Sequence, residues 1–352
     1  MGDMQEILKK VIRKENLSSE EAGSAMTEIM TGKTGEIRTA AFLTAMSMKG
    51  ETGKEIEAFA RSMRHAAVPW PGNSGEVLCD TCGTGGDSAS TINVSTISAL
   101  LLAAMGHKVA KHGNRAVSSS TGSADLLESI GVNLEMDHGE AFDCLKDVGI
   151  TFLFAPKWHP AMKHAGPVRK AMGVRTVFNL LGPITNPAPV SHQVVGVFNR
   201  DFMTPIAQAL AGLGRKGAYV VHSEDGLDEV SIAAPTLYVR IKNGVISGEG
   251  KVSPDDFGYK IRDIAEITVQ DRDDAVSRAK NILEGKGSET ENQTICMNAG
   301  LVHSLVTEND NLKVSAAECM KVLQSGKPME TLKKWATYHN ASGSVVSGGP
   351  GL

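Results

Sequence analysis

The sequence predicts an α/β protein with two parts, a small all-helical N-terminal domain and a larger α/β domain with a mostly parallel central sheet. Three observations support this prediction. Residues 1–70 show only the spacing of amphipathic helices, and the segment "VPWPGNSG", with two prolines and two glycines, then interrupts the helical pattern. Beyond it, short β-branched runs alternate with helical stretches, which is typical of βαβ units. A chain of 352 residues is long enough for two domains.

The individual elements follow from local patterns. In the helical part, apolar residues recur at helical spacing over 4–17, 18–32, 39–50 and 52–67, and Ser18-Ser19-Glu20-Glu21 resembles a helix start. In the second part we expect strands over 76–81, 107–113, 132–136, 150–156, 193–199 and 217–223, with helices over 93–106, 122–131, 139–149 and 203–214. An Asn243-Gly244 turn predicts a hairpin over 236–250, and helices return from about residue 270.

Composition narrows the classes of function. A net charge of −4 offers no basic field for nucleic acid, and no run reaches the roughly 18 apolar residues of a membrane helix. The N-terminal segment lacks the apolar centre of a signal peptide, and five cysteines are an odd number, so we expect a reducing cytoplasm. Cys79 and Cys82 form a C-x-x-C without a second ligand pair, which favours small buried side chains over zinc or redox chemistry.

Loops that follow the strands should form the site, because ligands bind beyond the carboxyl ends of an open parallel sheet. In the first loop, glycines 83, 85 and 86 allow backbone amides to approach a phosphate, and Asn93, Ser95 and Thr96 add donors at a helix start. The second loop, residues 111–128, gathers basic residues and then hydroxyls. Each loop alone has a plainer interpretation, a tight turn or a solvated loop capped at Ser123 or Asp125. Together they indicate a ligand with two separated phosphate groups.

Two further loops add a basic and an acidic element. Residues 154–187 are basic, and an arginine there such as Arg169 can clamp a carboxylate, although a single arginine is ordinarily just solvated. Residues 222–231 carry four acids, of which Asp228 and Glu229 are adjacent. Such hard oxygen ligands suit Mg²⁺ that substrate phosphates also hold.

Residue by residue, these loops resemble the anthranilate phosphoribosyltransferase family, which joins anthranilate to 5-phosphoribosyl 1-diphosphate (PRPP) in tryptophan biosynthesis. The matching stretches, in the family's order, are "GTGGD" at 83–87, "NVST" at 93–96, "KHGNR" at 111–115, "GSAD" at 122–125, "HPAMKHAGPVRK" at 159–170, "RTVFNLLGPITNP" at 175–187 and "DGLDE" at 225–229. The resemblance implies a helical domain of residues 1–70, completed by an inserted segment near 165–190, and an α/β domain of residues 75–352. It also implies Mg²⁺, a homodimer and PRPP at the interface of the two domains.

The resemblance further assigns site residues. The residues implied to bind PRPP are Gly83, Gly86, Asp87, Thr91, Asn93, Val94, Ser95, Thr96, Lys111, His112, Gly113, Asn114, Arg115, Ala116, Val117, Ser118, Ser119 and Ser123. Those implied to contact anthranilate are Gly83, His112, Asn114, His159 and Arg169, and those implied to hold metal are Ser95, Asp228 and Glu229. His112 is also a candidate acceptor of the amine proton, with a purely structural role as the alternative.

Three positions depart from the family pattern. Ser120 stands where lysine or arginine is frequent, Trp158 where tyrosine is common, and Ile92 where phenylalanine is frequent. These differences bear on substrate affinity and not on the reaction. Two other functions are compatible with this fold: a pyrimidine nucleoside phosphorylase, and a non-catalytic relative that binds nucleic acid. The long "RTVFNLLGPITNP" match and the acidic pair favour the transferase over the phosphorylase, and the acidic pair and the net charge of −4 argue against the nucleic-acid-binding relative.

Overall fold

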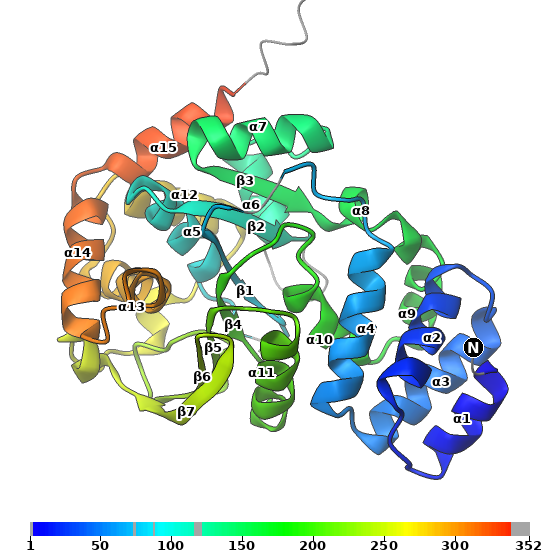
Figure 1. Ribbon diagram of the computed structural model, residues 1–352. Helices are drawn as coiled ribbons and strands as arrows, with labels where there is room; N and C mark the ends of the chain where they lie inside the picture. The colour runs from blue at the N-terminus through cyan, green and yellow to red at the C-terminus, as the bar shows by residue number, and fades with distance from the viewer. Residues whose placement is uncertain (1–2, 73–74, 87–88, 116–121, 339–352) are drawn as a thin grey trace, which may run out of the picture.

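The computed structural model describes residues 3–72, 75–86, 89–115 and 122–338, and it confirms the predicted fold class: a small helical lobe beside a larger α/β lobe (Figure 1). The helical lobe begins with α1 (Met4–Ile12), α2 (Ser19–Met30), α3 (Glu36–Lys49) and α4 (Gly53–His65). The helix start expected at Ser18 is a capping box, in which Ser18 Oγ accepts from the Glu21 N–H and the Glu21 carboxylate accepts from the Ser18 N–H. Among the described helices, none has the length and apolar character needed to cross a membrane.

The α/β lobe is built on a seven-stranded sheet of order β3-β2-β1-β4-β5-β6-β7. Its parallel strands are β1 (Leu78–Gly83), β2 (Lys108–Gly113), β3 (Ile150–Phe154), β4 (His192–Gly196) and β5 (Gly217–Ser223), and the expected hairpin of β6 (Thr236–Lys242) and β7 (Val245–Val252) continues the sheet antiparallel. The chain builds outward from β1 to β3 and then returns to the other side of β1 with β4. The order therefore reverses between β1 and β4, which is where open α/β sheets bind ligands.

Helices cover both faces of this sheet (Figure 1). Between the strands lie α5 (Val94–Ala104), α6 (Ser123–Ser129), α7 (His138–Val148), α8 (Ala155–Trp158), α9 (Gly166–Met172), α10 (Val177–Ile184) and α11 (Met203–Gly212). The helical tail expected from about residue 270 consists of α12 (Arg272–Leu283), α13 (Glu289–Thr307), α14 (Leu312–Gln324) and α15 (Lys327–Ala336). Short 3₁₀ turns occur at η1 (Pro160–Lys163), η2 (Arg200–Phe202), η3 (Pro254–Phe257) and η4 (Ile264–Ile267).

The prediction of a strand over residues 132–136 is wrong. Val132, Leu134 and Met136 are buried in alternation, so the period-two pattern is real, but the segment pairs with no strand of the sheet. The Asn133 side chain instead accepts a hydrogen bond of 2.8 Å from the Glu135 N–H, which bends the backbone into a turn. Alternating burial here comes from a loop lying on the core.

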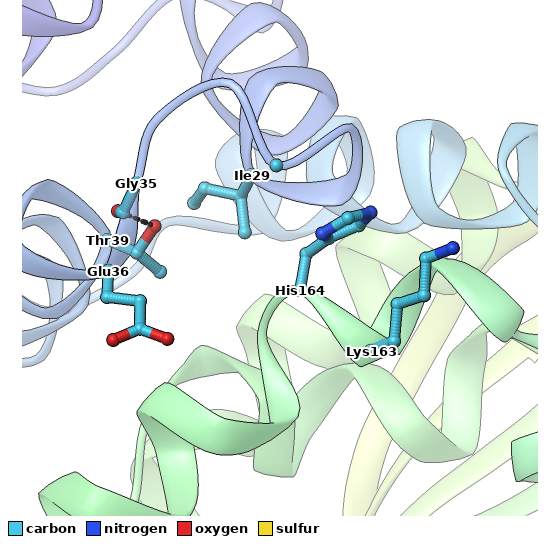
Figure 2. Close-up of a pocket in the computed structure, with 7 residues that line it drawn as sticks. Ile29, Gly35, Glu36, Thr39, Lys163 and His164 are labelled. Carbon is cyan, nitrogen blue, oxygen red and sulfur yellow. Dashed lines mark hydrogen bonds between the residues drawn. The ribbon is translucent and has the colours of Figure 1, made fainter.

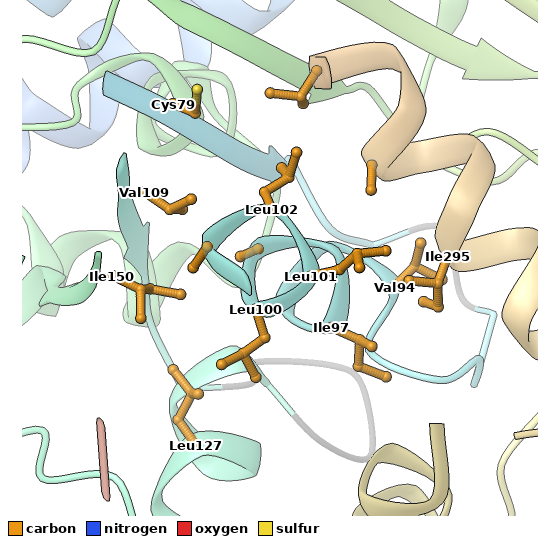
Figure 3. Packing of buried hydrophobic residues seen from close by; sticks show 14 of the residues in the cluster. Cys79, Val94, Ile97, Leu100, Leu101, Leu102, Val109, Leu127, Ile150 and Ile295 are labelled. Atoms are coloured by element: carbon orange, nitrogen blue, oxygen red, sulfur yellow. The ribbon is translucent and has the colours of Figure 1, made fainter. Parts of the chain in front are cut away.

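The sheet separates two apolar clusters. Figure 3 shows the first, in which Leu100 and Leu102 of α5 pack among Val109, Ile150 and residues of α6 and α13. The second joins the other sheet face and α11 to the helical lobe. Cys79 belongs to the first cluster and Cys82 to the second, because residues three apart in a strand point to opposite faces. Their expected burial is confirmed, and this geometry keeps the two thiols apart.

Helix α10 belongs to both lobes. Its side chains Val177, Phe178 and Leu181 are buried in the second cluster, and α10 contacts α3 and α4 of the helical lobe. Its last turn faces the α/β lobe, where the carbonyls of Gly182 and Pro183 accept hydrogen bonds from side chains on strands β2 and β4. The segment around 165–184 therefore supplies core residues to the helical lobe while its end is fixed to the α/β lobe.

Candidate active site

The loops after β1, β4 and β5 meet at the carboxyl edge of the sheet. The Thr84 N–H donates to the Gly196 carbonyl at 3.0 Å, and Thr84 Oγ1 accepts from the Phe198 N–H at 3.0 Å. The Gly85 N–H donates to Asp228 Oδ2 at 2.7 Å. The predicted glycine loop and the predicted acidic loop are thus in direct contact at the point where the strand order reverses.

Two glycines make this contact possible. Gly83 and Gly196 are register partners at the ends of β1 and β4, and the Asp228 segment lies directly against both. A Cβ on Gly83 would lie 2.3 Å from Asp228 Oδ2, and one on Gly196 would lie 1.4 Å from the Asp228 carbonyl oxygen. Gly85 and Gly86 adopt φ of +67° and +80°, which favours glycine. We call Gly83 and Gly196 the glycine shelf.

Lys111 lies beneath the glycine loop. The side chain is 1% exposed, and its ammonium donates to the Thr81 carbonyl at 2.6 Å and to Ser95 Oγ at 3.3 Å. Burial lowers the pKa of Lys111, whereas the negative charges of Asp80 and Glu229 raise it. Lys111 therefore contacts Ser95 and lies within the field of the Glu229 charge.

A buried polar network around Asp80 interacts electrostatically with Lys111, and the sequence analysis did not predict it. Asp80 is fully buried on β1, and burial raises the pKa of its carboxyl while the charge of Lys111 opposes this. Asp80 Oδ2 accepts from Asn186 Nδ2 at 2.9 Å and from Gln193 Nε2 at 3.2 Å, and Gln193 Oε1 accepts from Arg215 Nε at 3.0 Å. The sequence contains a signal for this network, because Asp80 is a charged residue within a segment whose pattern predicts a buried strand.

Two neutral histidines lie side by side next to α10. The His112 and His159 rings are buried with centroids 5.1 Å apart. Burial lowers the pKa of His112 to about 3 and that of His159 to about 4, so both are uncharged at pH 7. The Gly182 carbonyl accepts from His112 Nδ1 at 3.1 Å, which places the proton there and leaves a lone pair on Nε2, an atom with no hydrogen-bond partner among the described residues.

The basic segment around α9 approaches the glycine loop through Arg175, to which the sequence analysis gave no role. Its guanidinium donates to the Gly86 carbonyl and lies over the Phe198 ring, 4.2 Å from the centroid. Arg169 on α9 is half-buried over Phe178, at 5.2 Å. Burial lowers the pKa of Arg169, and no carboxylate of the described chain pairs with it. The Arg169 guanidinium therefore has donors available for an anion.

The two ends of the second loop, at Asn114 and Ser123, contact each other. Ser123 Oγ donates to the Asn114 carbonyl at 3.3 Å, and a Cβ on Gly113 would lie 2.4 Å from Ser123 Oγ. The cap differs from the expected one: Gly122 is the N-cap residue, Ser123 is the first helical residue, and the Asp125 carboxylate accepts from the Gly122 N–H at 3.0 Å. The exposed Arg115 side chain pairs with Glu128 at 2.7 Å.

The remaining predicted residues divide into two groups. Asn93 is the N-cap residue of α5, Val94 and Thr96 are buried in its first turn, and Thr91 forms a β-bridge with Thr268. Asp87, Ala116, Val117, Ser118, Ser119 and Ser120 lie outside the described residues. Trp158, at a position that departs from the family pattern, is buried, and Ile92 is buried as well.

The donor set fits a magnesium ion that substrate also holds. Asp228 and Glu229 supply hard oxygen atoms, and Ser95 adds a hydroxyl in the same environment. Within the described ranges, no three histidine, cysteine or acidic residues form a cage by themselves. Mg²⁺ is commonly bound by one or two carboxylates together with phosphate oxygens, so this sparse set is the expected one.

A separate pocket lies in the helical lobe and not at the sheet edge. Figure 2 shows it between the α2–α3 turn and the segment that carries Lys163 and His164, with Ile29, Glu36 and Thr39 on the opposite wall. None of the predicted site residues lines this pocket. We assign the candidate site to the loop cluster at the carboxyl edge of the sheet, because the predicted glycine loop, Lys111 and Asp228 meet there.

Comparisons with known proteins identify the family to which both domains belong. A family model described as "Glycosyl transferase family, helical bundle domain" matches residues 5–67, and one described as "Glycosyl transferase family, a/b domain" matches residues 75–329. The anthranilate phosphoribosyltransferase of Thioalkalivibrio sulfidiphilus is 40% identical over 96% of this chain and 98% of its own length. That of Marinomonas sp. is 45% identical over 85% of this chain and 86% of its own length.

Solved structures show the same likeness. The crystal structure of the enzyme from Thermus thermophilus superposes with a TM-score of 0.88 at 38% identity, covering 94% of this chain and 98% of that one. The enzyme from Saccharomyces cerevisiae, solved in complex with PRPP and Mg, gives a TM-score of 0.86 at 25% identity over 95% of this chain and 96% of that one. The chain belongs to the anthranilate phosphoribosyltransferase family, within the glycosyl transferases whose two domain models it matches.

Proposed function

We propose that this protein transfers the 5-phosphoribosyl group of PRPP to the amine of anthranilate, in tryptophan biosynthesis, with Mg²⁺ as its cofactor. The amine nitrogen forms a bond to C1 of the ribose, the bond from C1 to the diphosphate oxygen breaks, and the amine loses one proton. The observation that carries the proposal is the meeting of the glycine loop, Lys111 and the Asp228–Glu229 pair at one edge of the sheet. The relatives' names and the PRPP and Mg complex of the Saccharomyces cerevisiae enzyme support it.

The main chemical demand is to stabilise the departing diphosphate. Lys111 lies in a buried setting, where a charged side chain stabilises phosphate more strongly than in water; burial lowers its pKa, and the charges of Asp80 and Glu229 oppose this. The start of α5, around Asn93 and Ser95, provides further donors for phosphate oxygens, whereas the Thr84 and Gly85 amides of the glycine loop donate to the Gly196 carbonyl and to Asp228. Asp228, Glu229 and Ser95 would hold Mg²⁺, which supplies neutralisation of the diphosphate charge when bound.

The acceptor substrate needs orientation more than activation, because the aromatic amine is neutral at pH 7. Arg169, with donors available, would bind the anthranilate carboxylate, and Asn114 would contact the ring from the second loop. Holding the amine against C1 supplies rate through proximity. His112 donates its Nδ1 proton to the Gly182 carbonyl, its Nε2 is buried, and burial lowers its pKa to about 3, which favours a structural role over acceptance of the amine proton.

The direct test is the loss of anthranilate fluorescence on mixing protein, PRPP and Mg²⁺, with diphosphate release measured in parallel. We expect both signals at a ratio of one to one. Consumption of inorganic phosphate with a pyrimidine nucleoside, without diphosphate release, would identify a nucleoside phosphorylase instead. A salt-dependent gel shift without turnover would indicate a nucleic-acid-binding relative.

Replacing Arg169 by alanine should raise the KM for anthranilate at least about tenfold, because a hydrogen-bonded charge pair to the carboxylate is lost. The KM for PRPP should change far less. The neighbouring Lys170, which is exposed on the same helix, provides the matched control as Lys170→Ala. Steady-state kinetics that show the larger effect on PRPP would contradict the carboxylate assignment.

We also propose that the protein is a homodimer joined through its helical lobe. Three large apolar side chains are exposed there: Ile37 at 87%, Met48 at 74% and Ile12 at 65%. Residues 37 and 48 lie on one face of α3, since eleven residues make about three turns, and α1, which ends at Ile12, packs against α3. Exposed apolar groups clustered on adjoining helices favour burial against a second copy.

Changing Ile37 and Met48 to lysine together should weaken the dimer at least about tenfold, because charges would enter its apolar contact. Sedimentation velocity over a range of concentrations measures this. Val245→Lys, at another exposed apolar position on β7, is the control and should leave the assembly unchanged. A lysine variant that sediments as the parent protein does would rule out this face.

We add two further inferences, one on cellular location and one on the limits of the domains. We infer a cytoplasmic location, supported by five cysteines that are all buried and unpaired, as is common in reducing compartments. We infer domain limits of 1–70 with a helical insertion near 165–190, and 75–352. The packing of α10 among the side chains of the helical lobe supports the insertion.

A further inference from the structure

Asn298 makes an unusual pair of contacts with the acidic loop. It is 3% exposed in the middle of α13, far along the chain from the loop. Its Oδ1 accepts from the Val230 N–H at 2.9 Å, and its Nδ2 donates to the Val230 carbonyl at 3.0 Å. The second Nδ2 proton goes to the Thr294 carbonyl of its own helix at 3.0 Å. The side-chain amide therefore satisfies both backbone groups of Val230, as a neighbouring strand would.

Val230 directly follows Glu229, so this contact fixes one end of the acidic pair. The Val230 side chain is buried in the first apolar cluster, which prevents it from moving toward solvent. The other end is fixed at the sheet, where Asp228 lies on the glycine shelf and accepts from the Gly85 N–H. Residues 228–230 thus span between α13 and the glycine loop, with a hydrogen-bonded support at each end.

We propose that Asn298 is a positioning residue for the magnesium site: by holding Val230 it sets the backbone from which Asp228 and Glu229 present their carboxylates. The inference rests on the proposed function for the identity of the metal site. Without Asn298, the buried N–H and carbonyl of Val230 would lose their partners, and the segment would shift to recover them elsewhere. Because a cation needs both carboxylates in place, such a shift weakens metal binding even though Asn298 does not touch the metal.

Asn292 provides a matched control on the same helix. It is also a buried asparagine of α13, but its Nδ2 donates at 2.9 Å to the carbonyl of Gly287, which directly precedes the helix, and not to the acidic loop. Asn292→Ala and Asn298→Ala both remove a buried amide from α13. They differ in which backbone segment loses its support.

The experiment measures binding of Mn²⁺, an octahedral oxygen-seeking substitute for Mg²⁺, in the presence of diphosphate, from the free-ion signal in electron paramagnetic resonance. For Asn298→Ala we expect Mn²⁺ affinity to fall about 10- to 100-fold, the range typical of groups that orient metal ligands. The Mg²⁺ concentration for half-maximal velocity should rise in parallel, while the KM for anthranilate stays constant. Asn292→Ala should retain the parent Mn²⁺ affinity.

A second variant covers the case in which Asn298→Ala does not fold. Asn298→Gln keeps the amide but lengthens the side chain, so it should displace the segment and lower Mn²⁺ affinity to a smaller extent. Equal affinity in the folded Asn298 variants and the parent protein would overturn the proposal, as would an equal loss in Asn292→Ala or a parent protein that binds no Mn²⁺ with diphosphate. Normal Mn²⁺ binding without phosphoribosyl transfer would instead refute the proposed function alone.

Discussion

The double variant Asp228→Asn, Glu229→Gln should lose at least about 1000-fold in kcat/KM for PRPP while its fold persists. Both replacements keep the shape of the side chain and remove its charge, so the segment can stay on the glycine shelf. Two losses combine: the carboxylates no longer hold Mg²⁺, and Lys111 loses the nearby charge of Glu229 that favours its protonated form. Diphosphate release at rising Mg²⁺ concentration measures the activity, and urea unfolding measures the stability.

Glu224→Gln is the matched control for this variant. Glu224 belongs to the same loop but pairs with Lys251 at the surface, away from the glycine loop. It should retain the parent activity, because exposed ion pairs contribute little. If the double variant turned over PRPP at the rate of the control, the acidic pair would have no part in metal binding.

Gly196→Ala should reduce kcat/KM at least about 100-fold, because a shift of about 1 Å in a catalytic group can already cost that much. The added Cβ would lie 1.4 Å from the Asp228 carbonyl oxygen, whereas ordinary contacts begin at 3.4 Å. The oxygen belongs to the backbone, so relief requires the whole Asp228 segment to move. We expect the Mg²⁺ requirement to rise together with the loss of turnover.

The control for this second variant is Gly248→Ala on β7, where an added Cβ meets no atom within 4 Å. Thermal unfolding of both proteins separates loss of fold from loss of site geometry. Gly196→Ala with the turnover of Gly248→Ala would show that the acidic segment does not depend on the shelf.

Local signals in the sequence were enough for much of the fold. The box at Ser18, the Asn243-Gly244 turn and the glycine loop each depend on residues close together in the chain, so their conformations follow from short-range chemistry. The error at 132–136 has the same origin. Its alternation is that of a strand, but a strand also needs a neighbour with free backbone groups, and local sequence does not provide this information.

Two residues that support the site, Gly196 and Asn298, could not be predicted in this way. Gly196 carries no signal by itself, because its requirement comes from a carbonyl 32 positions later in the chain. Asn298 reads as an ordinary helix residue until α13 is placed beside Val230. Residues that contact substrate cluster in loops and form recognisable motifs, whereas the residues that hold those loops are distributed over the fold.

The two-sided attachment of α10 has a consequence for how this architecture can be rearranged. Residues 1–70 would lack Phe178 and Leu181 if they were expressed alone, and a truncated α/β lobe would keep an apolar helix with nothing to cover it. Recombination at the linker after α4 therefore cannot exchange the small lobe as a self-contained module. The Gly182 carbonyl at the end of α10 accepts from His112, so a displacement of α10 together with the helical lobe would also alter the hydrogen bond of this histidine.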